Sequence, residues 1–250
     1  MLLDIDTGYE GKFDFPRRAA PPELVYMLAS IPRTGSTYVS HLLWRTGCLG
    51  APLEYLNFEP SGPYFFAARS AENQTRLWRS LLHRRTSPNG VFGIKVFPVQ
   101  LQALQQGNPT LLAELRPTRI VYLDRRDRIA HIVSYARATM TGVWRKEQEK
   151  DLKARPAYSR EALEMAERGI EFQAAGWERM FRERGIEPLR LWYEDVVARP
   201  EDATRQVTDY LGVTLVPGAE VAVPPVLKQS AAGSEDWGLR YERSKDAGAR

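Results

Sequence analysis

Short apolar runs alternate along the chain with longer segments in which apolar positions recur every three or four residues. The runs predict β-strands and the periodic segments predict helices. The expected strands lie at 25–29, 91–97, 118–124 and 188–195. The expected helices lie at 36–46, 70–84, 99–106, 110–115, 127–140, 159–184 and 200–211. Because strands and helices alternate, we expect an α/β fold with a central, mainly parallel sheet flanked by helices.

Polar or Pro/Gly-rich stretches mark the ends of the predicted domain. Residues 1–22 are polar and interrupted by proline, and predict an N-terminal arm without structure of its own. Residues 23–250 are predicted to form a single domain, since 250 residues suffice for one sizeable α/β unit. Within it, 143–157 is highly charged and predicts a mobile connector, and 212–250 predicts a Pro/Gly-rich tail.

The composition is that of an ordinary globular protein, with 43% hydrophobic residues, 26% charged residues and a formal net charge of +4. Arginine supplies 28 of the 35 basic residues. Its planar fork can donate two hydrogen bonds to one phosphate or sulfate group. The 31 acidic residues are interspersed with the basic ones, without the long basic block typical of nucleic-acid binding. We therefore expect no nucleic-acid partner.

Cysteine and histidine usage narrows the function classes further. The single cysteine, Cys48, excludes an internal disulfide, and the three widely spaced histidines do not predict a metal site. The N-terminus has no signal-peptide pattern, and no apolar run reaches the ~20 residues that span a bilayer. We therefore expect a metal-free, cytoplasmic protein that does not insert into a membrane.

The first predicted strand leads into an anion-binding turn, in the sequence VYMLASIPRTGSTYVSHLL at 25–43. Gly35 lets the backbone approach a ligand closely. The helix starting near Ser36 offers N–H groups and the positive end of its dipole. Ser36 and Thr37 add hydroxyl groups, and Arg33 adds a guanidinium. The pattern predicts a phosphate or sulfate cradle, with an ordinary capped strand–turn–helix as the alternative.

This loop differs from a nucleoside-triphosphate P-loop. It lacks the lysine of the pattern G-x-x-x-x-G-K-[ST]. Asp124 ends the third predicted strand, but Arg125 and Arg126 follow it at once and argue against a magnesium ligand there. Arg126 and Ser134, two helical turns later, are instead candidates to clamp one phosphate. The alternative is that Arg125 and Arg128 are solvated, Asp127 caps the helix and Ser134 is a small interior residue.

Three of the four predicted strands end in polar groups, at Arg33–Thr37, Arg125–Ser134 and Tyr193–Asp195, and the remaining strand carries Lys95. In parallel α/β sheets, ligands bind at the carboxyl ends of the strands. These groups are therefore expected to converge on a single site.

The sequences RTGST (33–37) and RRDRIAHIVSYARATMTGVW (125–144) resemble the nucleotide-binding segments of sulfotransferases, and more narrowly those of the bacterial Stf0 family. Four further segments are similar to that family: TGCLGAPLEYLN (46–57), FGIKVFP (92–98), GWERMFRERGIEPLRLWYEDVVARPED (176–202) and DWGLRY (236–241). The resemblance covers about residues 24–241. His131 stands where glutamine is common in the family.

This resemblance implies a P-loop-like sulfotransferase fold. It also implies that the sulfuryl donor is 3′-phosphoadenylyl sulfate (PAPS), that the product is 3′-phosphoadenosine 5′-phosphate (PAP), and that no metal is needed. The residues it assigns to the 5′-phosphosulfate are Arg33, Thr34, Gly35, Ser36 and Thr37. It assigns the 3′-phosphate to Arg126 and Ser134. Trp237 and Arg240 are expected to border the donor.

The resemblance further implies that Glu54 is the general base. Lys95 and Arg33 are then candidates to stabilise charge on the sulfuryl and leaving oxygens. The acceptor is expected to be a hydroxyl of a carbohydrate or small metabolite, and the family suggests a homodimer. The alternatives are a P-loop-like nucleotide kinase and a non-catalytic module that binds nucleotides or nucleic acid.

Overall fold

The computed structural model describes Tyr9 and residues 11–57, 70–107, 117–144, 156–215 and 234–248. Its strands are β1 (Leu24–Ser30), β2 (Val91–Val96), β3 (Arg119–Asp124) and β4 (Leu189–Trp192). Its helices are α1 (Ser36–Arg45), α3 (Ala71–Arg84), α4 (Pro98–Gly107), α6 (Arg128–Thr141), α7 (Arg160–Arg184), α8 (Tyr193–Ala198), α9 (Pro200–Leu211) and α10 (Ser234–Gly248). The predicted helix at 110–115 and most of the predicted connector lie outside the described residues.

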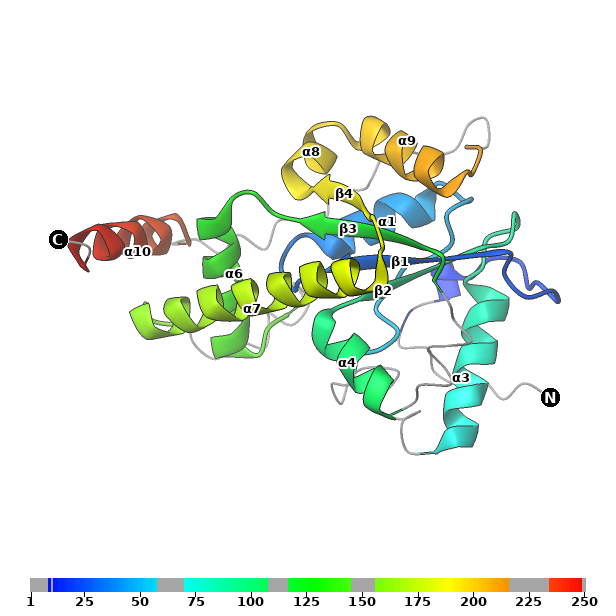
Figure 1. Cartoon of the computed structure of the whole chain (residues 1–250), viewed down its shortest axis with the longest axis horizontal. Coiled ribbons are helices and arrows are strands. Elements are labelled where there is room, and N and C mark those ends of the chain that lie inside the picture. Colours follow the sequence, from blue (N-terminus) through cyan, green and yellow to red (C-terminus); the bar gives the residue numbers. More distant parts are fainter. Residues whose placement is uncertain are drawn as a thin grey trace.

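The strands form one parallel sheet in the order β2-β1-β3-β4 (Figure 1). β1 lies between two partners, with Met27 opposite Ile94 of β2 and Ile120 of β3. The predicted α/β class and mainly parallel sheet are confirmed. Because every pair is parallel, the carboxyl ends of all four strands meet at one edge of the sheet.

Each face of the sheet is covered by its own hydrophobic core. Successive side chains of a strand point to opposite faces. Met27 and Tyr122 pack with residues of α6 and α7, including Trp177. Leu28 and Val121 pack with residues of α1 and α9 on the other face. In Figure 1, α8 and α9 accordingly lie on one side of the sheet, with α6 and α7 on the other.

The helix ends follow local sequence signals. The side chains of Ser70 and Ser159 accept hydrogen bonds from backbone N–H groups in the first turns of α3 and α7. Each such cap stabilises a helix by about 1 kcal/mol. Gly185 ends α7 in the left-handed conformation, and Pro200 opens α9. These predicted boundaries are confirmed.

The fourth predicted strand is too long. β4 ends at Trp192, and Tyr193 begins α8 instead of continuing the strand to residue 195. Trp192 pairs with Asp124, the last residue of β3. Beyond that pair β3 offers no further backbone partner, so the chain satisfies its polar groups by turning into a helix.

The prediction of a Pro/Gly-rich tail is wrong for Ser234–Gly248, which forms α10. Trp237 and Tyr241 lie one turn apart on this helix and are both buried. The Tyr241 hydroxyl and the Lys245 ammonium both donate to the carboxylate of Glu167 on α7, at 2.8 and 2.6 Å. The helix is held by this tertiary packing, which a local sequence window does not contain.

The described part of the N-terminal segment packs against the domain. Gly11–Phe13 forms a 3-10 turn, and the ring of Phe13 is only 4% exposed. Its centroid lies 4.6 Å from that of Trp44. The buried guanidinium of Arg85 pairs with Asp14, with 3.0 Å between Nε and Oδ1. This segment therefore holds one short turn and packs against the domain, and the predicted boundary of the N-terminal arm at residue 22 stays a prediction.

None of the described helices is long and apolar enough to cross a lipid bilayer.

Replacing Phe13 by alanine is expected to lower the free energy of unfolding by about 3 kcal/mol, because a buried aromatic ring leaves a cavity. Phe172 of α7 is the matched control, since its ring is 73% exposed. Phe172→Ala is expected to change stability by less than about 0.5 kcal/mol. Equilibrium unfolding in urea measures both values. Similar small losses for the two variants would show that Phe13 is not part of the core.

Candidate active site

The loop between β1 and α1 has two residues in the left-handed region, Arg33 (φ 73°) and Gly35 (φ 86°). Gly35 is the N-cap of α1 and, having no side chain, makes no capping hydrogen bond to the N–H groups of the first turn. Such N–H groups and the positive end of the helix dipole favour an anion. A non-glycine residue at positive φ costs about 1–2 kcal/mol, so neighbouring groups must hold Arg33 in place.

The hydroxyl-bearing residues of the loop differ in their surroundings. Thr34 is buried, and its hydroxyl donates to the carbonyl oxygen of Ile31 at 2.9 Å. Ser36 is buried at the start of α1, whereas Thr37 is exposed. Thr34 therefore shapes the loop from inside, and Thr37 carries the hydroxyl that is open to a ligand.

His131 of α6 fixes the loop from the protein interior. Its Nε2 lies 2.8 Å from the carbonyl oxygen of Pro32, which can only accept, so Nε2–H donates. Burial lowers the pKa of His131 to about 4, although the Pro32 carbonyl favours the protonated form. The imidazole is therefore neutral at pH 7 and serves as a hydrogen-bond donor to the loop. His131 is accordingly an interior residue, with its side chain buried.

The guanidinium of Arg33 lies against α6. Its Nε donates to the hydroxyl of Ser134 at 2.9 Å, and its Nη1 donates to the backbone carbonyl of Trp144 at 2.8 Å. Two of the predicted donor-binding residues, 101 positions apart in the sequence, are thus in direct contact. Both acceptors are neutral, so these two hydrogen bonds do not neutralise the charge of Arg33.

The two arginines that follow β3 point in different directions. Arg126 makes a two-fold pair with Asp195, with both Nη···Oδ distances at 2.6 Å. Arg125 instead extends to the loop, where Nη1 donates to the carbonyl oxygen of Arg33 at 3.4 Å and the guanidinium lies over the ring of Tyr193. The sequence analysis assigned Arg126 to the donor and missed Arg125. The two arginines are adjacent after the same strand, so sequence position alone does not tell which one reaches the loop.

The turn that carries these arginines is held by Glu194. Its carboxylate accepts the backbone N–H groups of Arg126 and Asp127, each at 3.1 Å. Burial alone would raise the pKa of Glu194, but these two N–H donors, its own backbone N–H and the charge of Arg125 together lower the pKa. Glu194 is therefore a structural carboxylate, which fixes the backbone at the carboxyl edge of β3.

Glu54 and Lys95 form an ion pair beside the loop. Leu53 makes an isolated parallel bridge to Ile94, which places the next residue of each segment side by side. The Lys95 ammonium lies 3.3 Å from Oε2 of Glu54 and donates to the hydroxyl of Thr37 at 3.4 Å. The structure thus brings together all three of these predicted site residues, although they come from three separate segments.

Gln100 completes the surroundings of Glu54, and the sequence analysis missed it. Its amide nitrogen donates to Oε1 of Glu54 at 2.9 Å. Its amide oxygen accepts the backbone N–H of Phe97 at 3.0 Å. Gln100 is the third residue of α4, after Pro98 at the first position, which is the position from which glutamine caps a helix N-terminus. This capping pattern is the sequence signal from which Gln100 could have been identified.

Trp237 and Arg240 lie on α10, and none of their contacts reported for the described residues reaches the loop. Trp237 is buried edge-on against Tyr158, and the guanidinium of Arg137 lies over its ring. The guanidinium of Arg240 lies 4.0 Å from the ring centroid of Tyr158. Their assignment to the donor stays a prediction.

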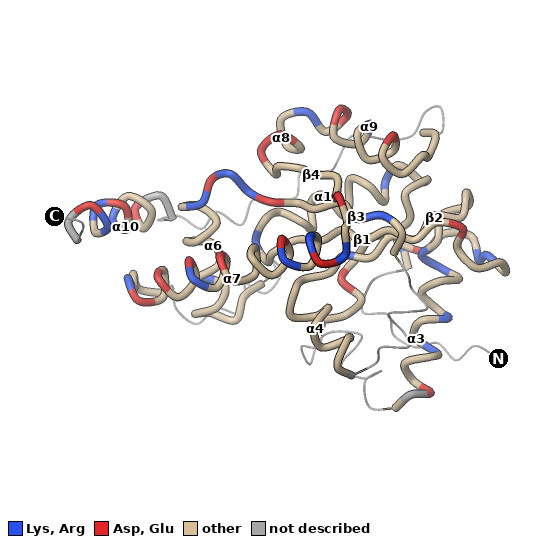
Figure 2. Tube along the Cα trace, viewed as in Figure 1, with Lys and Arg blue, Asp and Glu red and all other residues tan. Residues whose placement is uncertain are grey.

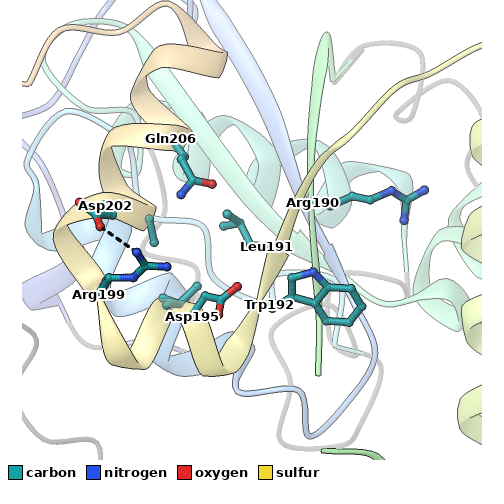
Figure 3. Close-up of a pocket in the computed structure, with 9 residues that line it drawn as sticks. Arg190, Leu191, Trp192, Asp195, Arg199, Asp202 and Gln206 are labelled. Carbon is teal, nitrogen blue, oxygen red and sulfur yellow. Dashed lines mark ion pairs between the residues drawn. The ribbon is translucent and has the colours of Figure 1, made fainter. Parts of the chain in front are cut away.

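A hollow between β4, α8 and α9 is separate from the loop (Figure 3). It measures about 60 Å³, well below the ~300 Å³ of a small-molecule site. Arg199 and Asp202 pair across its rim, and its lining contains no residue of the loop. We therefore place the candidate site at the loop and not in this hollow.

The described residues show no metal cluster, and their acidic and basic positions are mixed along two of the helices. No group of three or more His, Cys, Asp or Glu side chains within the described ranges is placed to hold a metal ion. Figure 2 shows acidic and basic residues intermixed along α7 and α10.

The fold and the site together define a class: an α/β protein with an anion-binding loop at the carboxyl edge of a parallel sheet, beside a lysine–glutamate pair. Residues 25–244 match the Stf0 sulphotransferase family. The chain therefore belongs to this family, and it is a sulfotransferase. The predicted resemblance is confirmed, and the kinase and non-catalytic alternatives are set aside.

Two relatives carry the name trehalose 2-sulfotransferase. The one from Mycobacterium tuberculosis is 28% identical over 255 aligned residues, which cover 86% of this chain and 93% of the relative. The one from Mycolicibacterium smegmatis is 26% identical, covering 87% and 94%. Among solved structures, the sulfotransferase domain of the Synechococcus PCC 7002 olefin synthase superposes with a TM-score of 0.49 at 14% identity, covering 89% of this chain and 86% of that one.

Gly35→Ala is expected to destabilise the protein by about 3 kcal/mol or more. A Cβ at this position would lie 2.2 Å from the ring of Tyr193, in addition to the cost of a positive φ. Gly47 is the matched control, because it also has a positive φ (72°) but no atom lies within 4 Å of its Cβ position. Gly47→Ala is expected to cost about 1–2 kcal/mol. Urea unfolding compares the two, and equal losses would mean that Tyr193 does not pack against the loop.

Proposed function

We propose that this sulfotransferase transfers the sulfuryl group of PAPS to a hydroxyl of a carbohydrate, with Glu54 as the general base. The observation that carries the proposal is the chain of contacts from Glu54 through Lys95 to Thr37. It connects a carboxylate, which can accept a proton, to a loop suited to an anion. Family membership and the names of the two relatives support the donor and the class of acceptor.

The donor's 5′-phosphosulfate is proposed to lie at the N-terminus of α1, against the backbone from Arg33 to Thr37. The guanidinium of Arg33 then supplies positive charge next to the phosphosulfate. We assign the 3′-phosphate to Ser134 and Arg126, as the family resemblance implies. Arg125 is a further candidate for phosphate contact, because it already extends to the loop carbonyl of Arg33.

In the proposed reaction, the acceptor oxygen forms a bond to sulfur while the bond from sulfur to the bridging oxygen of the 5′-phosphate breaks. The acceptor proton passes to Glu54, and PAP leaves with the bridging oxygen. General-base catalysis of this kind contributes typically about 10²–10⁴-fold. Lys95 and Arg33 stabilise the negative charge on the sulfuryl and leaving oxygens. Positioning and charge stabilisation therefore account for most of the catalysis, as in phosphoryl transfer.

A cytoplasmic location, expected from the sequence pattern, and a homodimer, suggested by the family resemblance, stay predictions. The metal-free mechanism is likewise part of this proposal.

Glu54→Gln is expected to lower turnover at least 100-fold, because the amide cannot accept the proton. The measurement is transfer from labelled PAPS with trehalose as the first acceptor probe. Glu164→Gln is the matched control, since the Glu164 side chain is partly exposed and pairs with Arg160 one turn away on α7, outside the candidate site. Wild-type turnover in Glu54→Gln would remove Glu54 as the base.

Donor binding is measured on the same two variants by thermal shift. PAP at 100 times its Kd should stabilise each by about 2.7 kcal/mol, without dependence on Mg²⁺. Stabilisation by ATP with Mg²⁺, and none by PAP, would contradict PAPS as the donor.

Arg126→Ala is expected to weaken PAP about 10- to 100-fold, the size of a lost charge-assisted hydrogen bond. Binding of adenosine 5′-phosphosulfate, which lacks the 3′-phosphate, should change little. Arg128→Ala is the matched control, because Arg128 is similarly exposed and is also paired with a carboxylate, that of Asp124. Calorimetric titration measures each affinity. A selective loss in Arg125→Ala instead would move the 3′-phosphate contact to that residue.

A further inference from the structure

The carboxylate of Glu54 is held from two sides, and one of the holding groups belongs to none of the motifs that identify the family. Oε2 lies next to Lys95, and Oε1 accepts a hydrogen bond from Gln100. We infer that Gln100 is a positioning residue, which anchors one carboxylate oxygen of Glu54 and leaves the other to take the acceptor's proton. The inference rests on the proposed function, in which Glu54 is the base.

The hydrogen-bonding direction of Gln100 is fixed by the start of α4. The backbone N–H of Phe97 is only a donor, so the group that faces it at 3.0 Å must be the amide oxygen. The amide nitrogen then necessarily faces Glu54, at 2.9 Å. Gln100 is only 4% exposed, so exchange of these partners for water is restricted. The helix cap thereby fixes the orientation of the amide, so that its nitrogen donates to the carboxylate of Glu54.

The two oxygens of Glu54 have different surroundings. The one near Lys95 is on the side of the loop, because the same ammonium also donates to Thr37. The one near Gln100 is directed toward α4. Each carboxylate oxygen has two lone pairs, so the oxygen beside Lys95 can bind both the ammonium and an acceptor hydroxyl. The geometry assigns proton transfer to that oxygen.

The backbone of Glu54 is fixed by separate contacts. Its N–H donates to the hydroxyl of Tyr9 at 3.2 Å, and the carbonyl of Leu53 accepts from the N–H of Lys95 at 3.0 Å. The remaining freedom is rotation of the glutamate side chain, which Gln100 restricts from one end. Misplacing a catalytic group by 1 Å costs about 10²-fold in rate, so this restriction bears directly on turnover.

Two substitutions separate positioning from helix capping. Gln100→Glu keeps an oxygen for the N–H of Phe97 but replaces the donor to Glu54 by an acceptor. Gln100→Met has a similar size and removes both hydrogen bonds. Both are expected to lower kcat about 10- to 100-fold, whereas KM for PAPS and Kd for PAP stay within about twofold of wild type. Gln102→Met is the matched control on the exposed side of the same helix and should match wild type.

A double-mutant cycle with Glu54→Gln tests whether Gln100 acts through Glu54. In the Glu54→Gln background, Gln100→Glu should reduce turnover by less than about twofold further. Losses that multiply would overturn the inference, as would wild-type kcat in both Gln100 variants. If Glu54→Gln itself kept wild-type turnover, the proposed function would fail at its base. Impairment in Glu54→Gln alone would defeat only the role of Gln100.

Crystal structures with PAP provide a readout that needs no acceptor. In the wild type, the Glu54 carboxylate should lie between Gln100 and Lys95. In Gln100→Glu it should rotate away from residue 100, since two carboxylate oxygens cannot share that contact without a proton. An unmoved Glu54 in Gln100→Glu would overturn the inference, whatever the turnover.

Discussion

The parallel pairing of β1 with both β2 and β3 is the constraint on which the site depends. Backbone hydrogen bonds on both sides fix the register, so Met27 lies opposite both Ile94 and Ile120. A shift of one residue would turn every side chain of the strand to the other face, out of its hydrophobic core. The register therefore fixes which polar groups reach the carboxyl edge of the sheet, and with them the relative positions of the loop, Lys95 and the arginines after β3.

Three arginines at this edge make specific contacts. Arg126 and Arg128 each pair with a carboxylate at close range. Arg33 donates to the hydroxyl of Ser134 and to the carbonyl of Trp144 at the centre of the candidate donor site. His131 beside it is neutral, because burial holds its pKa at about 4. The loop is thus supported from inside without an added charge, and its positive potential comes from Arg33 and the N-terminus of α1.

The contacts of Glu54 show how a catalytic arrangement is built from several parts of the fold. Tyr9 belongs to the N-terminal segment, Lys95 to β2 and Gln100 to α4. The N-terminal segment is itself anchored by the burial of Phe13 and the pair between Arg85 and Asp14. The backbone contact of Glu54 with Tyr9 therefore depends on packing some distance from the loop, and the stability of that segment and the geometry of the site are linked.

The sequence by itself determined the α/β class and, to within one residue at each end, the bounds of β2, β3, α3, α7 and α9. These features follow from local patterns: apolar runs, capping side chains and turn residues. The family motifs also gave the candidate residues of the loop, Lys95 and Glu54. What the sequence did not determine was the direction of each side chain, because direction depends on packing against elements far away in the chain.

Only the tertiary structure decided the contacts that make these residues a site. It directed Arg125 to the loop and Arg126 to Asp195, although the two are neighbours after the same strand. The capping position of Gln100 can be recognised in the local sequence. Its hydrogen bond to Glu54, 46 positions away in the chain, is visible only in the tertiary structure. The tertiary structure also ended β4 at Trp192, because β3 offers no pairing partner beyond Asp124. It made α10 a helix, because Trp237 and Tyr241 are buried against the rest of the domain. Long-range packing sets these features, and no short window of sequence contains it.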